Sequence, residues 1–320
     1  MTQDINIRLA RPSDYDKILK LSEGIYEGYD YLPATYHTWM AMKNLHVMLA
    51  FSGDKLVSLV AGSVIDDGKT LVTRAGRTLP ELRGQGINKL LSQALIDFVR
   101  KQNPVHERVR FTSVVKPEFA LRRSQEYESI LLLEKALLSC FVATSNQRSH
   151  QLVDIDSVEI QSCKKEYICD VIFRRESENL FPGNVIIADY FPFEPLRSNI
   201  DYLMQENSLI HFAVEKCADG FSPKSFSIGV LSQRVKSPYW NVTIYSNDPL
   251  LYQAHLVHHF KRSCADIEGE FLFACCQDQR FIDSGRMLLN KLVNIKSNES
   301  VDIKTLFLYE ARPRTVSSHI

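Results

Sequence analysis

The chain has 320 residues, of which 45% are apolar, and this length and composition suit a globular protein of two domains. Its 38 basic residues balance 38 acidic ones, so no excess of positive charge favours nucleic acid or an anionic membrane as a partner. We expect a cytoplasmic protein that does not enter a membrane, because the N-terminus shows no apolar signal segment and no run of about 18 apolar residues occurs. The seven cysteines lack C-x-x-C spacing and are expected to be reduced thiols that bind no metal.

Strands and helices alternate in the first half of the chain. Ser13 or Asp14 is placed to cap a helix, and Pro33 stands in the first turn of another. Gly53 and the run 66–68 mark two hairpin turns. The predicted strands are 5–10, 46–51, 55–65, 69–79, 108–115 and 129–141, and the predicted helices are 12–26, 30–44, 87–99 and 117–127.

The second half has a similar order of elements. Its predicted helices are 166–180, 194–206, 249–262 and 279–292, and its predicted strands are 184–190, 209–216, 225–233, 241–246, 270–276 and 302–310. From the second helix onward, both halves show one helix, three strands, and then helix, strand, helix and strand. This order predicts a tandem duplication into domains 1–147 and 148–320, with the boundary in the polar run 144–151.

The stretch "ELRGQGINKLL", residues 81–91, joins a strand to a helix and has the composition of an anion-binding loop. Gly84 and Gly86 allow successive backbone N–H groups to turn toward one point. The helix N-terminus adds a partial positive charge, and Arg83 adds a full one. The spacing fits neither G-x-x-x-x-G-K-[ST] nor G-x-G-x-x-G. We therefore predict a phosphate-binding loop of another kind.

The segment "RGQGIN" resembles the R-x-x-G-x-[GA] pyrophosphate loop of the GCN5-related N-acetyltransferases, except that Asn88 replaces the final Gly or Ala. This resemblance implies an α/β (α+β) fold of tandem acetyltransferase-like domains, each a mixed, mostly antiparallel sheet flanked by helices. It also implies acetyl-CoA as the co-substrate, with no metal. The residues expected to bind it are Thr78, Leu79, Arg83, Gly84, Gln85, Gly86, Ile87 and Asn88.

Longer stretches resemble the histidine N-acetyltransferases and the closely similar probable N-acetyltransferase sixteen group. These stretches are "GIYEGYDYLPATYHTW", "VIDDGKT", "RTLPELRGQGI" and "PGNVIIADYFPFEP". The resemblance implies acetyl transfer from acetyl-CoA to the α-amino group of L-histidine. Composition and spacing do not themselves name the acceptor.

The aromatic corner, residues 25–39, contains four tyrosines and one of the two tryptophans, and it has two interpretations. It is either a packed helix–helix corner or the binding site for a small amino acid that carries an imidazole. On the second interpretation, the acceptor-binding residues are Tyr26, Asp30, Tyr31, His37 and Trp39.

Arg74 and Arg77 lie on the strand that precedes the glycine loop, and either could bind the carboxylate of an amino acid. Residues three apart on a strand face opposite sides, so one of the two points into the site unless a bulge intervenes. Arg74 is the preferred carboxylate ligand, and a plain surface charge is the alternative for each.

Tyr127 is the candidate general acid, because many members of the resembled fold place a tyrosine on the fourth helix for this step. Another alignment puts Ser124 or Arg122 at that position. The general base that would remove the amine proton is left open among Glu23, Asp30 and Asp66.

The second half has no glycine loop, and Asp248 is expected to cap the corresponding helix and repel phosphate. The second domain is therefore expected to be degenerate and to bind no coenzyme A. His255, His258 and His259 have a spacing that could bind metal, but an exposed or capping role is favoured. Two alternatives to the leading function remain: acetylation of another small amine or peptide N-terminus, and non-catalytic coenzyme A binding.

Overall fold

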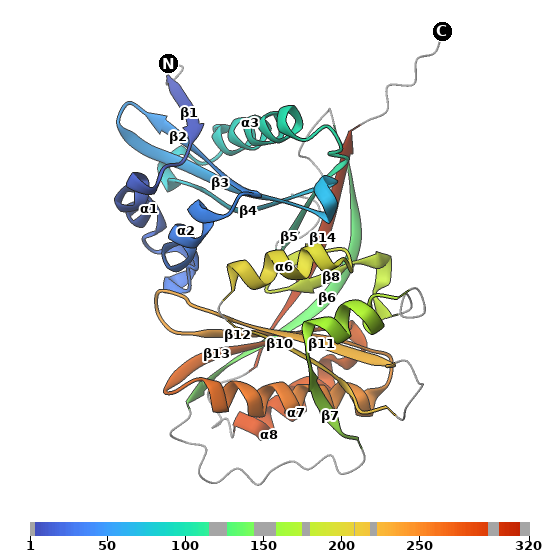
Figure 1. Ribbon diagram of the computed structural model, residues 1–320. Helices are drawn as coiled ribbons and strands as arrows, with labels where there is room; N and C mark the ends of the chain where they lie inside the picture. The colour runs from blue at the N-terminus through green and yellow to red at the C-terminus, as the bar shows by residue number, and fades with distance from the viewer. Residues whose placement is uncertain are drawn as a thin grey trace. The chain divides into compact units, whose positions relative to one another are not determined.

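The computed structural model describes residues 4–114, 127–143, 158–174, 180–207, 209–217, 223–293 and 301–313. The chain forms two compact units (Figure 1). Unit 1 comprises residues 1–132, 234–236 and 308–320, and unit 2 comprises 133–233 and 237–307. No helix in the described part of the chain is both long and apolar enough to cross a membrane.

Unit 1 follows the predicted order of elements closely. Its strands are β1 (Ile5–Leu9), β2 (Leu45–Ser52), β3 (Lys55–Ile65), β4 (Thr70–Thr78) and β5 (Arg108–Ser113). Its α-helices are α1 (Tyr15–Ser22), α2 (Leu32–Ala41) and α3 (Ile87–Gln102), and its 3-10 turns are η1 (Pro12–Asp14), η2 (Ile25–Gly28), η3 (Asp66–Gly68) and η4 (Pro80–Leu82). The sheet runs in the order β1-β2-β3-β4-β5, and it is antiparallel except for the parallel pair β4–β5.

The parallel pair β4–β5 separates early. Only Thr70, Leu71 and Val72 of β4 are paired with β5 in the described residues, although β4 continues to Thr78. The segment 73–78 therefore leaves its neighbour at the end that leads into the glycine loop. A strand that diverges in this way leaves main-chain groups along its edge for a ligand.

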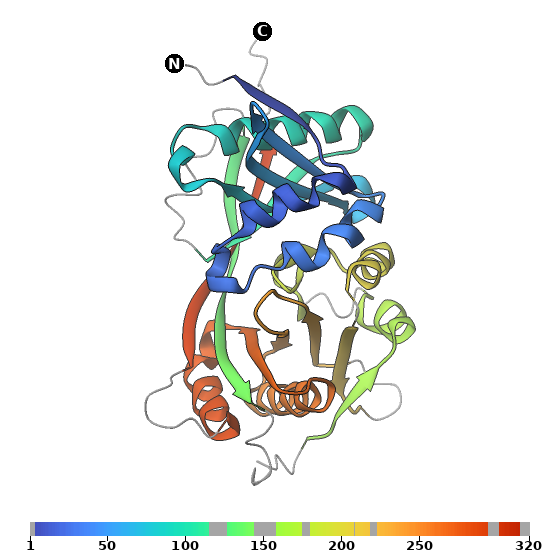
Figure 2. The same ribbon diagram turned by 90° about the vertical axis from the view of Figure 1, so that its left-hand side faces the viewer.

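Helices cover both faces of the unit 1 sheet (Figures 1 and 2). Helix α3 packs on one face through Leu91 and Leu95, which join a buried cluster with Leu71 of β4. Gly62 of β3 permits this close approach, because a Cβ atom there would lie 2.6 Å from Leu71 Cδ1 and 2.8 Å from Leu95 Cδ2. Helices α1 and α2 pack together on the other face, where Trp39 is fully buried.

Unit 2 has the strands β6 (Tyr127–Ala143, from residue 133), β7 (Ile160–Cys163), β8 (Ile186–Ala188), β9 (Phe191–Phe193), β10 (Leu209–Glu215), β11 (Ser225–Ser232), β12 (Tyr239–Ser246), β13 (Glu270–Gln277) and β14 (Asp302–Pro313, to residue 307). Its helices are α5 (Lys165–Tyr167), the π-helix η6 (Ile168–Ile172), α6 (Arg197–Glu206), α7 (Pro249–Asp266) and α8 (Ile282–Val293), with 3-10 turns η8 (Pro182–Asn184) and η9 (Gln279–Phe281). The parallel pair β12–β13 corresponds to β4–β5 in unit 1.

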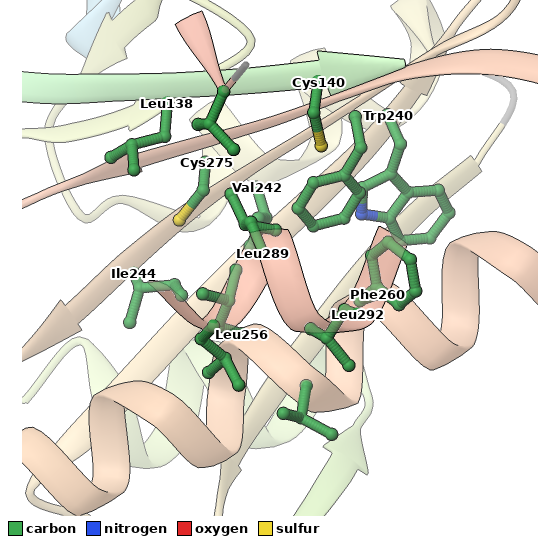
Figure 3. Close-up of a cluster of buried hydrophobic side chains, with 14 of the residues drawn as sticks. Leu138, Cys140, Trp240, Val242, Ile244, Leu256, Phe260, Cys275, Leu289 and Leu292 are labelled. Atoms are coloured by element: carbon green, nitrogen blue, oxygen red, sulfur yellow. The ribbon is translucent and has the colours of Figure 1, made fainter. Parts of the chain in front are cut away.

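The core of unit 2 lies between α7, α8 and the strands β6, β12 and β13 (Figure 3). Trp240, Phe271 and Phe273 are fully buried there. Leu256 and Phe260 project from α7 toward Val242 and Cys140 of the sheet, as the 3.6-residue period of an amphipathic helix requires.

Several sequence predictions differ from unit 2. The helix predicted over 166–180 is replaced by the short elements α5 and η6, which end at Ile172. Strands β7 and β9 were not predicted, and Pro192 in the middle of β9 argues against a strand in sequence patterns. The predicted helix 117–127 lies outside the described residues except for Tyr127, which begins β6.

The units do not follow a single cut in the sequence. In unit 1, the strand beside β5 is supplied by residues 308–313 of β14, from the end of the chain. In unit 2, the strand beside β13 is β6, from the middle of the chain. The predicted boundary within 144–151 itself lies outside the described residues.

Candidate active site

The glycine loop has the backbone conformation that the sequence predicts. Gly84 and Gly86 both have φ of 80°, and Gly86 immediately precedes α3. Apart from the adjacent residues in the chain, no heavy atom of the described residues lies within 4 Å of the position where a Cβ atom would stand at either glycine. These glycines are therefore required for their left-handed backbone rather than for packing space.

The N-terminus of α3 presents its main-chain N–H groups at this loop. No side chain caps the helix, and the first N–H groups of a helix have no partner within it. Ile87 is buried and anchors the first turn, whereas Arg83, Gly84, Gln85 and Gly86 are exposed. Exposed amides, a helix dipole and the Arg83 guanidinium form a site suited to a diphosphate.

The remaining loop residues lie against the end of β4. The Arg83 Nε donates to the Thr78 carbonyl at 3.2 Å. Asn88 lies next to Gly76, since a Cβ atom at Gly76 would be 3.3 Å from Asn88 Nδ2. Gln85 Nε2 donates to the Glu81 carbonyl at 3.3 Å, which steadies the loop.

Thr78 and Leu79 were expected to offer main-chain groups to the pantetheine arm. In the structure, the Thr78 carbonyl accepts from Arg83, the Leu79 N–H donates to the Val57 carbonyl at 3.0 Å, and the Leu79 carbonyl accepts from Leu82 N at 3.0 Å. These groups already have protein partners. A carbonyl oxygen can accept a second hydrogen bond, so the roles of Thr78 and Leu79 stay predictions, and the part of β4 that has separated from β5 offers further main-chain groups.

A β-bulge brings Arg74 and Arg77 to the same face of the sheet. Arg77 pairs with Leu59 and Arg74 with Ala61, so two residues of β4 stand opposite Val60 alone. Ala75, within the bulge, has φ of 55°. The extra residue changes the alternation of side chains, so both arginines face α1 and α2. The bulge that was named as the exception to plain strand alternation is therefore present here.

Arg77 is 5% exposed and has fixed partners. Its Nη1 donates to the carboxylate of Asp30 and to Ser22 Oγ, the latter at 3.0 Å. Its Nε and Nη2 atoms are buried and have no hydrogen-bond partner among the described residues. Buried guanidinium N–H groups are costly to leave unsatisfied, so these two atoms are suited to bind a ligand carboxylate.

Asp30 has a different task from the one expected. Its side chain is 1% exposed, one oxygen accepts from Arg77, and the other accepts from Leu32 N at 3.0 Å, at the start of α2. It orients Arg77 and fixes the start of α2. Arg77 is thus held with two buried donor atoms that could bind an acceptor carboxylate, and the preference for Arg74 stays a prediction.

Tyr31 and Trp39 form an aromatic wall beside these arginines. Their ring centroids are 5.8 Å apart, and the Arg74 guanidinium lies 4.4 Å from the Trp39 ring. The Arg77 and Arg234 guanidiniums lie 5.9 Å and 4.9 Å from the Tyr31 ring. Desolvation raises the pKa of half-buried Tyr31 to about 12, so its hydroxyl stays protonated at neutral pH.

Two predicted acceptor residues lie at the margin of this group. Tyr26 is 59% exposed. His37 is also exposed, and its ring packs against Tyr15 at 4.5 Å between centroids. The structure thus brings together Asp30, Tyr31, Trp39, Arg74 and Arg77 more closely than it does these two.

The candidates for proton transfer are only partly placed. Asp66 is fully buried and bound to Arg110 at 3.2 Å, so its carboxylate serves an ion-pair network rather than a substrate. Glu23 is exposed. Tyr127 begins β6, but its side chain lies outside the description, as do Arg122 and Ser124. The identity of the general acid stays a prediction.

The corresponding helix start in unit 2 is already occupied. The Asp248 carboxylate accepts from Leu250 N at 2.7 Å and Leu251 N at 3.1 Å, which confirms the predicted cap of α7. The same N–H groups would be needed to hold a phosphate, and a carboxylate at this position repels one. Unit 2 thus has no counterpart of the glycine loop in its described residues.

The α7 histidines form hydrogen bonds inside unit 2. His255 lies 2.8 Å from Ser225 Oγ and 2.6 Å from Ser227 Oγ, and His259 lies 2.8 Å from the same Ser227 Oγ. His258 Nε2 lies 2.9 Å from His211 Nε2. His255 and His259 are fully buried in the packing of α7 on the sheet, so the exposed or capping role expected for them is wrong.

Two family models match this chain. Residues 15–123 match the model described as "Acetyltransferase (GNAT) family", and residues 157–278 match "Histidine N-acetyltransferase, C-terminal". With the separated β4–β5 pair and the glycine loop, these matches define an acetyl-CoA-dependent acyltransferase. The first half of the chain is thus similar to the GNAT acetyltransferases, and the second half is similar to the C-terminal region of the histidine N-acetyltransferases.

Individual relatives agree with this assignment. The chain is 24% identical over 286 residues to Histidine N-acetyltransferase of Scomber australasicus, covering 84% of this chain and 82% of the relative. It is 23% identical over 291 residues to Probable N-acetyltransferase 16 of Homo sapiens, covering 86% and 76%. A solved tandem GNAT protein from the clavulanic acid biosynthesis pathway matches with a TM-score of 0.56 and 10% identity over 98% of this chain and 100% of that one. These findings confirm the expected family and tandem fold.

The sequence analysis missed two residues that contact Arg77 or Tyr31 in the candidate site. Ser22 ends α1 and supports Arg77, but no motif marks it. Arg234 lies more than 150 positions away from the other site residues, between β11 and β12, so no local pattern could place it there.

Proposed function

We propose that this enzyme transfers the acetyl group of acetyl-CoA to the α-amino group of free L-histidine, giving N-acetylhistidine and coenzyme A. The observation that supports the choice of an amino acid is the pair of buried donors on Arg77 that have no partner among the described residues, beside an aromatic wall. The choice of histidine rests on the relatives named Histidine N-acetyltransferase. A flat aromatic wall suits an imidazole, and a bidentate guanidinium suits a carboxylate.

The chemistry requires the neutral amine. Its nitrogen attacks the thioester carbonyl carbon, a C–N bond forms, and the C–S bond breaks. The amine loses one proton to a base or to water, and coenzyme A leaves as a thiolate whose pKa is close to that of cysteine, about 8.5. A strong general acid is therefore not essential.

Residues in and after β4 have different roles in this reaction. The loop from Arg83 to Asn88 holds the diphosphate, and the separated edge of β4 holds the pantetheine arm. Arg77, fixed by Asp30 and Ser22, binds the acceptor carboxylate so that the amine faces the thioester. Proximity of this kind can itself supply much of the rate enhancement.

The test is a screen of the twenty amino acids with acetyl-CoA, read out as free thiol and as N-acetyl product by mass spectrometry. We expect the highest kcat/KM with L-histidine. Equal kcat/KM for histamine would favour a general amine acetyltransferase, and coenzyme A binding without turnover on any amino acid would favour a non-catalytic regulator.

We also propose that unit 1 holds the single coenzyme A site of the chain, because Asp248 occupies the matching helix start in unit 2. Calorimetric titration of the intact protein with coenzyme A should give one site. Two equivalent sites would contradict this proposal.

A further inference from the structure

The ion pair between Arg77 and Asp30 uses one nitrogen and one oxygen, although an arginine and a carboxylate can pair through two parallel hydrogen bonds. The oxygen that accepts from Arg77 Nη1 is Oδ2, and the other oxygen of Asp30 accepts from Leu32 N at 3.0 Å. The carboxylate is therefore shared between the start of α2 and Nη1 of Arg77. It does not bond to Nε or Nη2, which have no partner among the described residues.

Ser22 accepts the second hydrogen bond of the same nitrogen. Arg77 Nη1 donates to Ser22 Oγ at 3.0 Å, and Ser22 is the last residue of α1 and only 7% exposed. Because a guanidinium is planar, two fixed partners on one of its nitrogens set the rotation of the whole group. The direction in which Nε and Nη2 point therefore depends on Ser22 as well as on Asp30.

The Nε and Nη2 atoms of Arg77 form the second edge of the guanidinium, and both are buried. This edge carries two parallel N–H groups, a fork that matches the two oxygens of a carboxylate. Buried donors are costly to leave unsatisfied, so the fork indicates a ligand that offers two acceptors. A carboxamide is a poor match, because its NH2 group is itself a donor and would face one N–H of the fork.

We propose that Ser22 is a positioning residue that orients this fork of Arg77 toward the acceptor, and that the fork selects a free α-carboxylate over a carboxamide. The inference rests on the proposed function and deepens it, because it defines the acceptor class as free amino acids. In a peptide, an amide replaces the α-carboxylate of the first residue, so a peptide N-terminus leaves part of the fork unsatisfied. Ser22 acts through Arg77 and makes no contact with the acceptor in this assignment.

The experiment compares L-histidine with L-histidinamide, which keeps the imidazole and the α-amine but carries a carboxamide in place of the carboxylate. For the intact wild type and the variant Ser22→Ala, kcat and KM are measured with both acceptors, and L-histidinamide is also titrated as a competitive inhibitor. We expect the wild type to favour L-histidine in kcat/KM by about tenfold or more.

Ser22→Ala should reduce this preference about fivefold or more, chiefly by raising the KM for L-histidine, while the KM for acetyl-CoA stays within about twofold. An unchanged KM for acetyl-CoA shows that unit 1 is folded in the variant. Because the same ratio is compared between two proteins, the different basicity of the two amines cancels.

Two further variants separate positioning from a general structural effect. Ser22→Thr keeps the hydroxyl and should keep the preference of the wild type within about twofold. Ile18→Val is the matched control, because Ile18 is fully buried on the same helix and its truncation weakens the packing of α1 without removing a hydrogen bond to Arg77. It should lower the melting temperature and leave the preference for the carboxylate unchanged.

An equal kcat/KM of the wild type for L-histidine and L-histidinamide, or an unaltered preference in Ser22→Ala, would overturn this inference alone. The same loss of preference in Ile18→Val as in Ser22→Ala would also overturn it, because disturbed packing of α1 would then explain both. If the wild type acetylates no amino acid, both this inference and the proposed function are wrong.

Discussion

The guanidinium of Arg77 and the carboxylate of Asp30, 47 positions apart, form an ion pair whose side chains are 3% and 1% exposed. Burial of two charges is tolerable because each neutralises the other and Ser22 and Leu32 N add hydrogen bonds. The pair links the bulged end of β4 to the start of α2. It therefore determines where the remaining donors of Arg77 point.

Replacing Asp30 with asparagine should destabilise the protein strongly. The change leaves the Arg77 charge buried without a counter-ion, which typically costs about 3–5 kcal/mol of unfolding free energy. Urea unfolding of Asp30→Asn measures this loss. The control is Asp16→Asn, an exposed carboxylate of α1, which should change the unfolding free energy by less than about 0.5 kcal/mol. Equal effects of the two variants would contradict the structural role of Asp30.

The double variant Gly84→Ala/Gly86→Ala should bind acetyl-CoA less tightly. Each alanine must adopt φ of 80° at a strain of about 1–2 kcal/mol or let the loop move, so we expect the KM for acetyl-CoA to rise about tenfold or more. Gly53→Ala is a matched control, since Gly53 has φ of 59° and equally open space but lies in the turn between β2 and β3. It should show the strain in thermal unfolding without a change in this KM. A normal KM in the double variant would refute the diphosphate site.

The stability of unit 2 should fall as the pH drops below about 6.5. Burial lowers the pKa of His255 to about 3 and that of His211 to about 4, whereas an unfolded histidine titrates near 6.5. Between these values the unfolded state binds protons that the folded state does not. Stability conferred by the neutral histidines is therefore complete above pH 6.5 and is lost toward pH 4, by about 1.4 kcal/mol per pH unit for each.

Urea unfolding monitored at several pH values between 7 and about 5 measures this slope, above the range in which free carboxylates titrate. His255→Gln keeps groups that can hydrogen-bond to Ser225 and Ser227 but cannot take up the proton. The unfolding free energy of this variant should therefore depend less steeply on pH than that of the wild type, by about 1.4 kcal/mol per pH unit. His37→Gln, at an exposed position, serves as the control and should leave the slope as it is. Identical slopes in all three proteins would show that the buried histidines do not control acid stability.

Glu310→Gln should destabilise unit 1 through the last strand. Glu310 is 1% exposed and accepts from Arg110 Nε at 2.9 Å, and Arg110 also binds Asp66. Without the Glu310 charge, Asp66 alone balances the charge of Arg110. We therefore expect the free energy of unfolding, measured with urea, to fall by about 3–5 kcal/mol. Asp302→Asn, in the same strand but with a 54% exposed side chain paired to Lys304, should cost less than about 1 kcal/mol. A similar cost for both would argue against the buried network.

Most elements of both units could be predicted, because β2–β4 and α3 have clear apolar periodicity and the turns contain glycine or aspartate. The glycine loop could be predicted because its function depends on local backbone geometry. The roles of Asp30 and Arg77 could not, because they depend on a bulge at Ala75 that the sequence analysis could allow for but not locate. The position of Arg234 and the exchange of the last strands depend on contacts between distant parts of the chain, which periodicity does not encode.

The placement of residues 308–313 beside β5 has a consequence for the order of events during protein synthesis. Although the glycine loop is made within the first third of the chain, Arg110 meets Glu310 only after translation has passed the final strand. The nascent N-terminal half therefore leaves the ribosome with an open sheet edge beside β5, and Arg110 then has Asp66 but not yet Glu310 as an ion-pair partner. We therefore expect a fragment ending near residue 147 to lack both the strand beside β5 and the Glu310 partner of Arg110.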